Sequence, residues 1–506
     1  MPRFTIIVAM LMIGTYAVAF NPYQDVSERL KGAHEVGLED VVFVIRSQAT
    51  SPHVERARRI KDDIAQQCRL HNLDHPDVVL LHERYGGPYS GHWTLLPALP
   101  KIYNEFEQKK WFFFCEEDTR VNVQGLIALL SRFSSGEDWF LGKSLFDQEA
   151  TIIHHFRFHD SLSEFIFPDF DAGWILSEAV MKSMVSRLDK EKPKIDFSID
   201  VKHELAHYIW NEESGLHMTG LPQLCAGNID PSDLSPLTDE QAMQKIQFSK
   251  ANPTKSGSIC VTASPKALPE CGPPVPGKNV FFAVKTCDKF HSERVPVVQR
   301  TWGRFAEHMV YFSNKADISI PTVDLGVPNT ERGHCGKTFA IFDQFLNNPE
   351  YRTFPWLAIT DDDTIISVSR LQRLLSCYDA TKPIMLGERY GYGQVKGLGY
   401  DYITGGGGMI FSRPAVDDII SNGCRCSKND DPDDMIIGMC AKRYRIPLAN
   451  SPLFHQARPS DYAKGLLAHQ TPVSFHKHWN VNPDQVYSDW FLKADEDLKN
   501  ASHDEL

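Results

Sequence analysis

The chain alternates apolar strands with amphipathic helices, and this pattern occurs twice, which constrains the fold more than any other feature. In the first half the pattern begins with a strand at 40–48 and reaches the apolar strand WFFFCEED at 111–118. In the second half it begins again at 279–287 and reaches WLAITDDDT at 356–364. Such alternation predicts an α/β fold with two tandem domains, each a mostly parallel sheet flanked by helices. Between the two strands of the first half we expect a helix at 53–71, a strand at 77–84 and a helix near 92–107.

Later segments repeat in the same order. DAGWILS at 171–177 corresponds to GGGMIFS at 406–412, and the helical segment at 199–210 corresponds to DDMIIGMCAKRY at 433–444. A Pro/Gly-rich stretch between the halves has the composition of a domain linker. These features favour an internal duplication over two unrelated α/β domains. The predicted organisation is a signal peptide at 1–19, an N-terminal domain at 20–263, a linker at 264–278, a C-terminal domain at 279–502 and a retrieval signal at 503–506.

Both ends of the sequence carry address signals. Residues 1–19 contain Arg3, an apolar stretch and Ala17-Val18-Ala19, the pattern of a cleaved secretory signal peptide. An uncleaved anchor is the alternative, but the apolar run is shorter than the roughly 20 residues that span a bilayer. The sequence ends in HDEL at 503–506, which a receptor recognises as an endoplasmic reticulum retrieval signal. We therefore expect a lumenal protein that binds the HDEL retrieval receptor and has no membrane span after cleavage.

Charge and cysteine content narrow the possible partners. A net charge of -12 without a basic stripe argues against a nucleic-acid partner. The 11 cysteines can form disulfides in an oxidising compartment, with an odd one left over. Cys424 and Cys426 are too close in sequence to pair easily with each other. Asn500 lies in an N-x-[ST] sequon near the end of the chain.

Three consecutive aspartates, Asp361, Asp362 and Asp363, follow an apolar strand of the second half. Adjacent carboxylates repel one another, and each costs several kcal/mol to bury without a partner. In α/β sheets, ligands bind beyond the carboxyl ends of the strands. Carboxylate oxygens there suit Mg²⁺ or Mn²⁺ bound together with substrate phosphates. The triplet therefore predicts a divalent cation held against a diphosphate, with an exposed acidic turn as the alternative.

Three further segments provide candidate substrate contacts. A second acidic run opens a helix at Pro432, where Asp433 or Asp434 is a candidate general base; acids in a first turn can also simply stabilise the helix dipole. His455 in SPLFHQ is a candidate ligand or a structural histidine. Glycine lets a backbone approach a ligand closely, although a β-bulge or a flexible loop is the alternative. Four glycines precede the apolar strand expected at 409–412: Gly405, Gly406, Gly407 and Gly408.

Together these motifs resemble the glycosyltransferase family that contains Fringe and the β-1,3-galactosyl- and N-acetylglucosaminyltransferases. The resemblance covers the second half of the chain and implies a GT-A fold, with a DxD motif, a UDP-sugar donor, Mn²⁺ or another divalent cation, and inverting transfer. Because the two halves share one plan, we expect both to be Fringe-like. The matching segments, in the family's order, lie at 281–302, 334–345, 356–364, 404–412, 431–439 and 451–456.

The resemblance implies a role for each matching residue. Asp363 and His455 would hold the metal, with Asp361 nearby. Asp434, in preference to Asp433, would deprotonate the 3-hydroxyl of the acceptor, and the departing UDP would need no separate acid. The glycines at 405–408 would form the acceptor-side loop. The implied donor-binding residues are Lys285, Thr286, Arg294, Lys337, Asp361 and Asp362.

The duplication, the two address signals and SFHKHWNVNP at 474–483 are similar to one subgroup of this family. Its members add β-1,3-linked glucose to O-linked fucose on thrombospondin type 1 repeats. The resemblance thus implies UDP-glucose as donor and O-fucosylated thrombospondin type 1 repeat proteins as acceptors. The residues alone do not distinguish UDP-glucose from UDP-GlcNAc or UDP-Gal. Another Fringe-like β-1,3-glycosyltransferase is therefore the alternative.

Two readings compete with glycosyl transfer. HELAH at 203–207 has the H-E-x-x-H form of a zinc metalloprotease, in which His203 and His207 share a helix face and Glu204 is the base. A third ligand is not obvious, and Glu240 is only a distant candidate. A lumenal lectin-like or chaperone-like binder without catalysis is the other reading. Loss of the aspartate triplet would favour it, and the triplet is present.

The first half departs from the pattern of the second. It retains Asp118, Asp200 near the base position, and His217 in SGLHM, which corresponds to SPLFH. Its acidic run, however, contains Glu116 in place of an aspartate, and its glycine loop is reduced to DAGW. The longer side chain changes metal geometry and fewer glycines restrict ligand approach. We therefore predict a non-catalytic domain that helps to bind the folded acceptor.

Overall fold

The computed structural model describes residues 34–504 except for eight internal gaps, the longest of which is 228–259. The predicted signal peptide, Glu240 and the last two residues of HDEL lie outside the described residues. No helix within the described part of the chain is long and apolar enough to cross a membrane. The gaps are 74, 87–90, 159–163, 212–213, 228–259, 265–267, 270 and 398.

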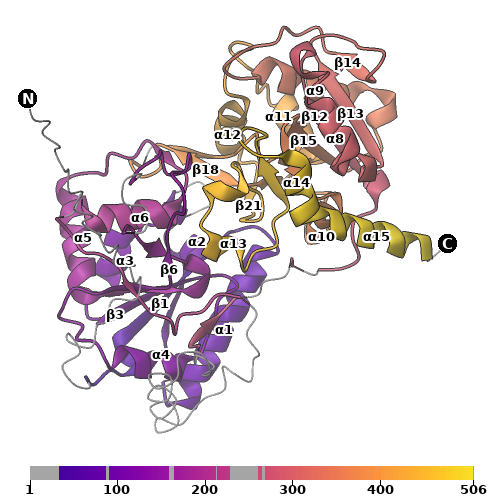
Figure 1. The fold of residues 1–506 in the computed structure, drawn as a ribbon. Coiled ribbons are helices and arrows are strands. Elements are labelled where there is room, and N and C mark those ends of the chain that lie inside the picture. The colour runs from indigo at the N-terminus through magenta and orange to yellow at the C-terminus, as the bar shows by residue number, and fades with distance from the viewer. Residues whose placement is uncertain are drawn as a thin grey trace, which may run out of the picture.

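The N-terminal half forms a six-stranded, mostly parallel sheet (Figure 1). Its strands read as short apolar runs because both faces are covered. In order across the sheet they are β10 (Thr219–Gly220), β5 (Phe140–Gly142), β8 (Trp174–Ser177), β3 (Trp111–Glu116), β1 (Val41–Arg46) and β2 (Asp77–Leu80). The principal helices are α1 (His53–Leu70), α3 (Leu99–Glu105), α4 (Val123–Leu130), α5 (Glu178–Lys190) and α6 (Val201–Trp210).

The C-terminal half forms a seven-stranded sheet of the same kind. Its strand order is β14 (Thr322–Asp324), β13 (His308–Ser313), β12 (Val280–Lys285), β15 (Trp356–Asp361), β20 (Met409–Ser412), β17 (Met385–Gly387) and β21 (Leu448–Asn450). Its principal helices are α8 (Val295–Arg300), α9 (Cys335–Asn347), α10 (Val368–Leu375), α11 (Arg413–Ser421), α12 (Asp433–Tyr444), α14 (Pro483–Tyr487) and α15 (Lys493–Asp504). The predicted α/β class with two tandem sheets is confirmed.

The two sheets repeat each other down to single hydrogen bonds. Arg46 of β1 pairs in register with Glu116 of β3, and Lys285 of β12 pairs with Asp361 of β15. After each acidic strand, a threonine hydroxyl accepts a hydrogen bond from the last amide of that strand. The same hydroxyl donates a hydrogen bond to a carbonyl just before the antiparallel neighbour in the sheet, β8 or β20. Thr119 does so in the first half and Thr364 in the second. This agreement supports the predicted internal duplication.

Two predicted elements differ in the structure. Only the first four residues of the expected strand at 77–84 belong to β2; the rest form the short helix α2 (Leu81–Arg84). The expected helix near 92–107 is interrupted, and α3 begins only at Leu99. Pro97 cannot donate the backbone hydrogen bond that a helix interior requires, so a continuous helix is excluded there.

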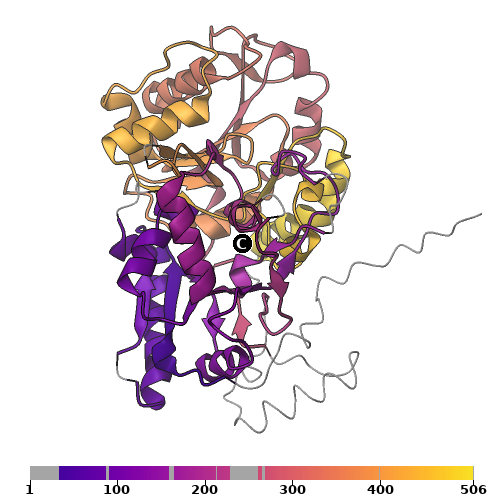
Figure 2. The same cartoon turned by 90° about the vertical axis from the view of Figure 1, so that its left-hand side faces the viewer.

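The halves share a core and a small sheet. One cluster of buried apolar side chains contains residues of both sheets. Strand β9 (Phe197–Ser198) of the first half pairs with β18 (Arg389–Tyr392), which in turn pairs with β19 (Tyr400–Ile403). Across the contact, Gln48 exchanges two hydrogen bonds with the backbone of Asn450. Figure 2 shows the two halves stacked against each other along this contact.

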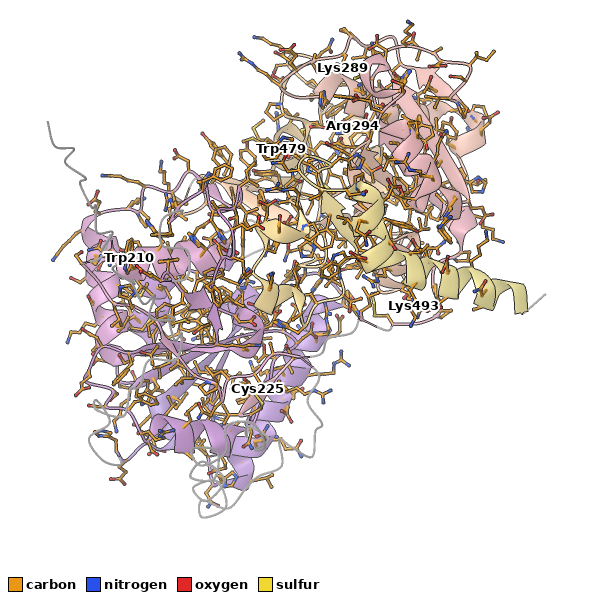
Figure 3. The ribbon with its side chains drawn as sticks, in the orientation of Figure 1. Trp210, Cys225, Lys289, Arg294, Trp479 and Lys493 are labelled. Carbon is orange, nitrogen blue, oxygen red and sulfur yellow. A yellow bond between two sulfur atoms is a disulfide. The ribbon has the colours of Figure 1, made fainter. Side chains whose placement is uncertain are left out.

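Eight of the 11 cysteines form disulfides. Cys424 and Cys426 bond to different partners, as their spacing predicts, while Cys68, Cys115 and Cys287 are buried thiols. The first half contains one disulfide, at Cys225, which is labelled in Figure 3. The pairs are Cys225–Cys260, Cys271–Cys377, Cys335–Cys426 and Cys424–Cys440.

Candidate active site

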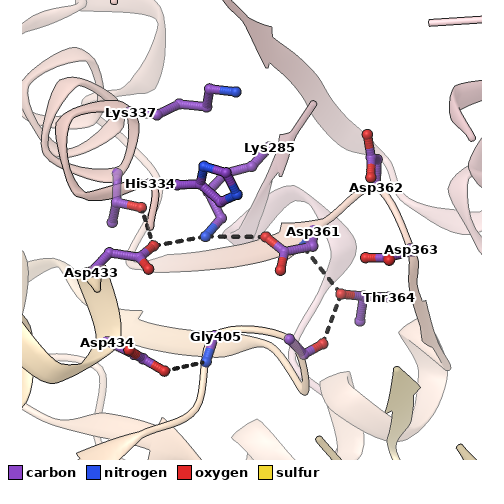
Figure 4. A network of polar contacts seen from close by, with 12 residues as sticks. Lys285, His334, Lys337, Asp361, Asp362, Asp363, Thr364, Gly405, Asp433 and Asp434 are labelled. Carbon is purple, nitrogen blue, oxygen red and sulfur yellow. Dashed lines mark hydrogen bonds and ion pairs between the residues drawn. The ribbon is translucent and has the colours of Figure 1, made fainter. Parts of the chain in front are cut away.

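The aspartate triplet lies at the carboxyl end of β15, and Figure 4 shows it together with Lys285. Lys285 Nζ is 3.1 Å from an oxygen of Asp361. Arg294 Nη1 lies 2.8 Å from Asp362 and 3.0 Å from Asp363. Burial raises the pKa of Asp362 to about 6, and the adjacent charge of Asp363 adds to this effect. Asp362 and Asp363 are buried and Asp361 is partly exposed, so the triplet is a charge cluster paired with cations and not an exposed acidic turn.

A histidine completes a group of metal-compatible ligands. Asp361, Asp363 and His476 each offer one donor atom, and the three atoms lie within 4.8 Å of one another. His476 Nε2 is 3.1 Å from Asp363 and 3.9 Å from Asp361. Two carboxylates and one imidazole form a suitable donor set for Mn²⁺ or a similar divalent ion. The residues therefore fit the metal that the aspartate triplet predicts.

His455 does not belong to this group, which corrects its predicted role as a metal ligand. Its Nδ1 lies 3.1 Å from the carbonyl of Leu453 and 3.2 Å from that of Ser474, and its Nε2 lies 3.1 Å from Gln470. Both ring nitrogens of this buried side chain are thus engaged in structural contacts. The pairing of β22 (Ser474–His476) with β16 (Thr364–Ile366) places His476 directly opposite Thr364, next to the aspartates.

SFHKHWN contains the one histidine of the metal-compatible group, a residue that the sequence pattern did not predict as a ligand. Its His476 belongs to β22, which lies beside the triplet, whereas the sequence of 474–483 indicates only a subgroup of the family. A short β strand after SPLFH, with a histidine in it, was an available clue. Its pairing partner, however, is more than a hundred residues earlier in the chain, so spacing alone did not reveal it.

The predicted glycine loop surrounds this group. A Cβ added at Gly406 would lie 2.4 Å from the ring of His476, so only glycine allows the histidine this close approach. Gly408 has a φ of +100°, a conformation that side chains with a Cβ rarely adopt. The amide of Gly405 donates to Asp434, and that of Gly407 donates to Gln456. The loop therefore joins the metal-compatible group to the candidate base.

The structure distinguishes the two candidate bases. Asp433 contacts Lys285 at 2.7 Å and accepts a hydrogen bond from Thr338. Burial alone would raise the pKa of Asp433, but Lys285 and Thr338 outweigh it and hold this pKa below its usual value. Asp434 has no ion pair with any described cation. Burial and then the neighbouring charge of Asp433 raise the pKa of Asp434 to about 7. A carboxylate with a pKa near 7 is suited to proton abstraction at neutral pH.

The remaining predicted donor-binding residues, Thr286 and Lys337, form a chain of hydrogen bonds that leads to the triplet. The hydroxyl of Thr286 donates to Asp362 at 2.7 Å. Lys337 is buried, and its ammonium donates to the carbonyl of Thr286 and contacts Asn329 at 3.3 Å. Burial lowers the pKa of Lys337. These residues lie around the triplet as the sequence predicts, but their contact with a donor stays a prediction.

The equivalent place in the first half is neutralised within the chain. Arg46 Nε lies 2.6 Å from Glu116, and Arg56 lies 2.9 Å from Glu117 and 3.1 Å from Asp118. Among the described residues these three acids belong to no metal-compatible group. In the first half, therefore, two arginines supply the positive charge that a metal would supply in the second half.

Two sequence correspondences in the first half need different interpretations. Asp200 caps α6 and contacts Lys202 at 2.9 Å, so its carboxylate is paired in a way that Asp434 is not. His217 precedes β10, whereas His455 follows the equivalent strand β21, so the match between SGLHM and SPLFH is wrong. The ring of His217 accepts a hydrogen bond from Trp210 instead.

The HELAH segment does not form a protease site in the described part of the chain. His203 belongs to a metal-compatible group with Asp147 and His154, and this group includes neither His207 nor Glu204. The rings of His203 and His154 stack at 3.8 Å, and Glu204 accepts a hydrogen bond from the backbone of Ile199. The segment forms α6, the counterpart of α12, so the duplication explains why it is helical.

Comparison with known proteins extends over both halves. A family model described as Fringe-like matches residues 95–201 and 275–501. A β-1,3-glucosyltransferase of Mus musculus is 46% identical over 479 residues, covering 94% of this chain and 92% of that protein. A β-1,3-glucosyltransferase of Homo sapiens is 47% identical over 465 residues, covering 92% and 87%. The human β-1,3-N-acetylglucosaminyltransferase lunatic fringe is 27% identical over 217 residues, covering 38% and 55%.

Proposed function

Because the chain belongs to the Fringe-like family and is a β-1,3-glycosyltransferase, we propose that it transfers glucose from UDP-glucose to O-linked fucose on thrombospondin type 1 repeats. Relatives named β-1,3-glucosyltransferase that are similar along more than nine-tenths of this chain support the sugar. The resemblance of 474–483 to the O-fucose-extending subgroup supports the acceptor. The alternatives are UDP-GlcNAc or UDP-Gal as the donor.

The observation that carries the mechanism is the arrangement of Asp434 across the glycine loop from the metal-compatible group. Asp361, Asp363 and His476 would hold Mn²⁺, which supplies Lewis-acid stabilisation of the departing diphosphate. Lys285 and Arg294 hold the aspartates in place and contribute positive charge beside them. The residues of the chain therefore provide a site for an anionic leaving group.

Asp434 acts as the general base. Ionised Asp434 takes the proton of the acceptor's 3-hydroxyl as that oxygen attacks the anomeric carbon, and the bond to UDP breaks on the opposite face. This single displacement inverts the anomeric centre, so an α-linked donor gives a β-linked product, as a base does in inverting glycosidases. Asp433 does not take this role because Lys285 and Thr338 occupy its carboxylate.

We also propose that the protein acts in the lumen of the endoplasmic reticulum and is retained through HDEL. The signal-peptide pattern and the terminal tetrapeptide support this location, as do four disulfides, which persist in oxidising compartments.

The test is sugar transfer to an O-fucosylated thrombospondin type 1 repeat from a panel of UDP-sugars, with Mn²⁺ or with EDTA. We expect transfer of glucose alone, in the presence of Mn²⁺ and not with EDTA. Transfer of N-acetylglucosamine or galactose would keep the mechanism and refute the proposed donor. Transfer that survives EDTA would refute the metal, and transfer only to unfucosylated repeats would refute the acceptor.

The N-terminal half, in this proposal, is non-catalytic and helps to bind the folded acceptor. The three-stranded sheet β19–β18–β9 crosses from one half to the other. Rings on its three strands form a row, with centroids 5.8 Å apart for Tyr400 and Tyr392 and 5.0 Å apart for Tyr392 and Phe197. Phe197 and Tyr392 are each 40% exposed. Because β19 packs against α12, which carries Asp434, the row begins beside the base and ends on the N-terminal half.

Replacing both Phe197 and Tyr392 by alanine is expected to raise the KM for the folded, fucosylated repeat roughly 10-fold, because exposed aromatic side chains contribute most to such contacts. The KM for UDP-glucose, and transfer to a small alkyl fucoside, should not change. The control is Leu70→Ala, which removes an exposed apolar side chain outside the row, at the end of α1. An equal loss with the small fucoside would refute a role in binding the folded acceptor.

A further inference from the structure

A second group of metal-compatible ligands lies at the contact between the two halves. Asp169, Asp171 and His469 each offer one donor atom, and the three atoms lie within 4.8 Å of one another. The two aspartates precede β8 in the N-terminal half, whereas His469 belongs to the C-terminal half. His469 Nε2 lies 3.2 Å from Asp169 and 3.6 Å from Asp171. The group therefore connects the halves directly.

The polar atoms of this group are incompletely satisfied. Asp169 is fully buried, and neither of its carboxylate oxygens accepts a hydrogen bond from a described residue. His469 Nε2 is also buried, and its contact with Asp169 lacks hydrogen-bond geometry. Lys143 lies 3.6 Å from Asp169, beyond hydrogen-bond distance. A buried carboxylate without hydrogen bonds is costly unless a cation binds it directly.

The donor set has the composition of the catalytic group. Both consist of two aspartates separated by one residue, together with one histidine from a distant segment. In the catalytic group, too, a cationic side chain and the histidine contact the carboxylates, as Arg294 and His476 do with Asp363. Lys143 and His469 lie on Asp169 in a similar way, but Lys143 is farther away, at 3.6 Å. Two carboxylates and one imidazole suit a first-row divalent ion.

The duplicated fold explains how the group arose at this place. The carbonyl of Asp171 accepts from Thr119 as the carbonyl of Gly406 accepts from Thr364, so Asp171 occupies the position of Gly406. In the second half the ring of His476 approaches Gly406 closely. In the first half, His469 of the other half of the chain approaches Asp171. The group therefore lies at the same edge of its sheet as the catalytic group.

We propose that Asp169, Asp171 and His469 form a second divalent-cation site, separate from the catalytic one, that fastens the N-terminal half to the C-terminal half. His469 precedes Gln470, which contacts His455, and the same segment continues into β22 with His476. A cation at this site would anchor the segment that supplies the histidine of the catalytic group. Transition-metal ions such as Mn²⁺ and Zn²⁺ are the class of ligand expected.

The test is the number of ions bound per chain. The protein is stripped with a chelator, dialysed against Mn²⁺ or Zn²⁺, and analysed by mass spectrometry for metal content. We expect two ions in the wild type, one in Asp169→Asn, one in Asp363→Asn, and none in the double variant. His469→Gln, which keeps a polar side chain of similar size, should also bind one ion. It serves as the test variant if Asp169→Asn does not fold.

A second measurement separates a bound ion from an ion pair. In the Asp363→Asn protein, added metal should raise the midpoint of thermal unfolding, and this rise should disappear when Asp169→Asn is added. One ion in the wild type and none in Asp363→Asn would overturn the proposal and leave only an Asp–His–Lys ion pair. A count that Asp169→Asn does not lower would also overturn it, because that ion would then lie elsewhere, for example at the group of Asp147, His154 and His203. These counts do not depend on which sugar is transferred.

Discussion

Asp434→Asn is expected to lower kcat by roughly 10²–10⁴-fold, the contribution of a general base. The amide keeps the shape of the side chain and its contact with Gly405 but cannot accept the proton of the acceptor hydroxyl. The KM for the UDP-sugar and the dependence on Mn²⁺ should stay unchanged, because Asp434 belongs neither to the aspartate triplet nor to the metal-compatible group. Steady-state kinetics with separate variation of donor and acceptor test this result.

The pH dependence tests the same assignment. Because Asp434 must be ionised to act and its pKa is raised to about 7, kcat/KM for the acceptor should increase with pH through about 7 and decrease below it. Asp430→Asn, which changes an exposed acid of the same run, should leave both rate and profile unchanged. A rate that falls with Asp430→Asn as much as with Asp434→Asn would contradict the assignment, as would a profile without a step near 7.

His476→Gln is expected to raise the Mn²⁺ concentration for half-maximal activity by more than 100-fold. Loss of a residue that merely orients a ligand costs 10–100-fold in metal affinity, and His476 contacts Asp363 and Asp361 directly. Glutamine is a poor ligand for transition metals but preserves a polar side chain next to Gly406. Activity and metal binding are measured as functions of Mn²⁺ concentration.

His455→Gln is the matched control for this variant. The ring of His455 contacts two carbonyls and Gln470, and not the aspartates. Its replacement should lower the free energy of unfolding by about 1–3 kcal/mol, the cost of disturbed buried hydrogen bonds. The Mn²⁺ dependence should stay near that of the wild type. If His455→Gln changes the Mn²⁺ dependence and His476→Gln does not, the original sequence-based prediction is right and the present assignment is wrong.

Local pattern accounts for what could be predicted. The apolar strands, the acidic ends of β3 and β15, and the helix that starts at Asp433 follow from residue type and spacing over short stretches. The duplication was visible because the two halves repeat these stretches in the same order. The proline at 97 was also visible in the sequence, yet the helix was predicted through it, and this boundary was wrong.

The choice between neighbouring candidates could not be predicted from spacing. Asp433 and Asp434 are adjacent, but the helix turns by about 100° from one residue to the next. One carboxylate therefore points to Lys285 and the other to Gly405. Likewise His476 belongs to β22 and His455 contacts the carbonyl of Ser474 in the same strand, and only the strand pairing decides which ring reaches the aspartates.

The sequence by itself determined the α/β class, the repeat and the carboxylates at the end of β15, because periodicity and local composition are properties of short segments. Only the tertiary structure decided which histidine joins those carboxylates, which aspartate is free to act as a base, and that Asp169 and Asp171 meet His469. Each of these depends on contacts between segments far apart in the chain. Such contacts arise from the packing of whole sheets and helices, which no local pattern specifies.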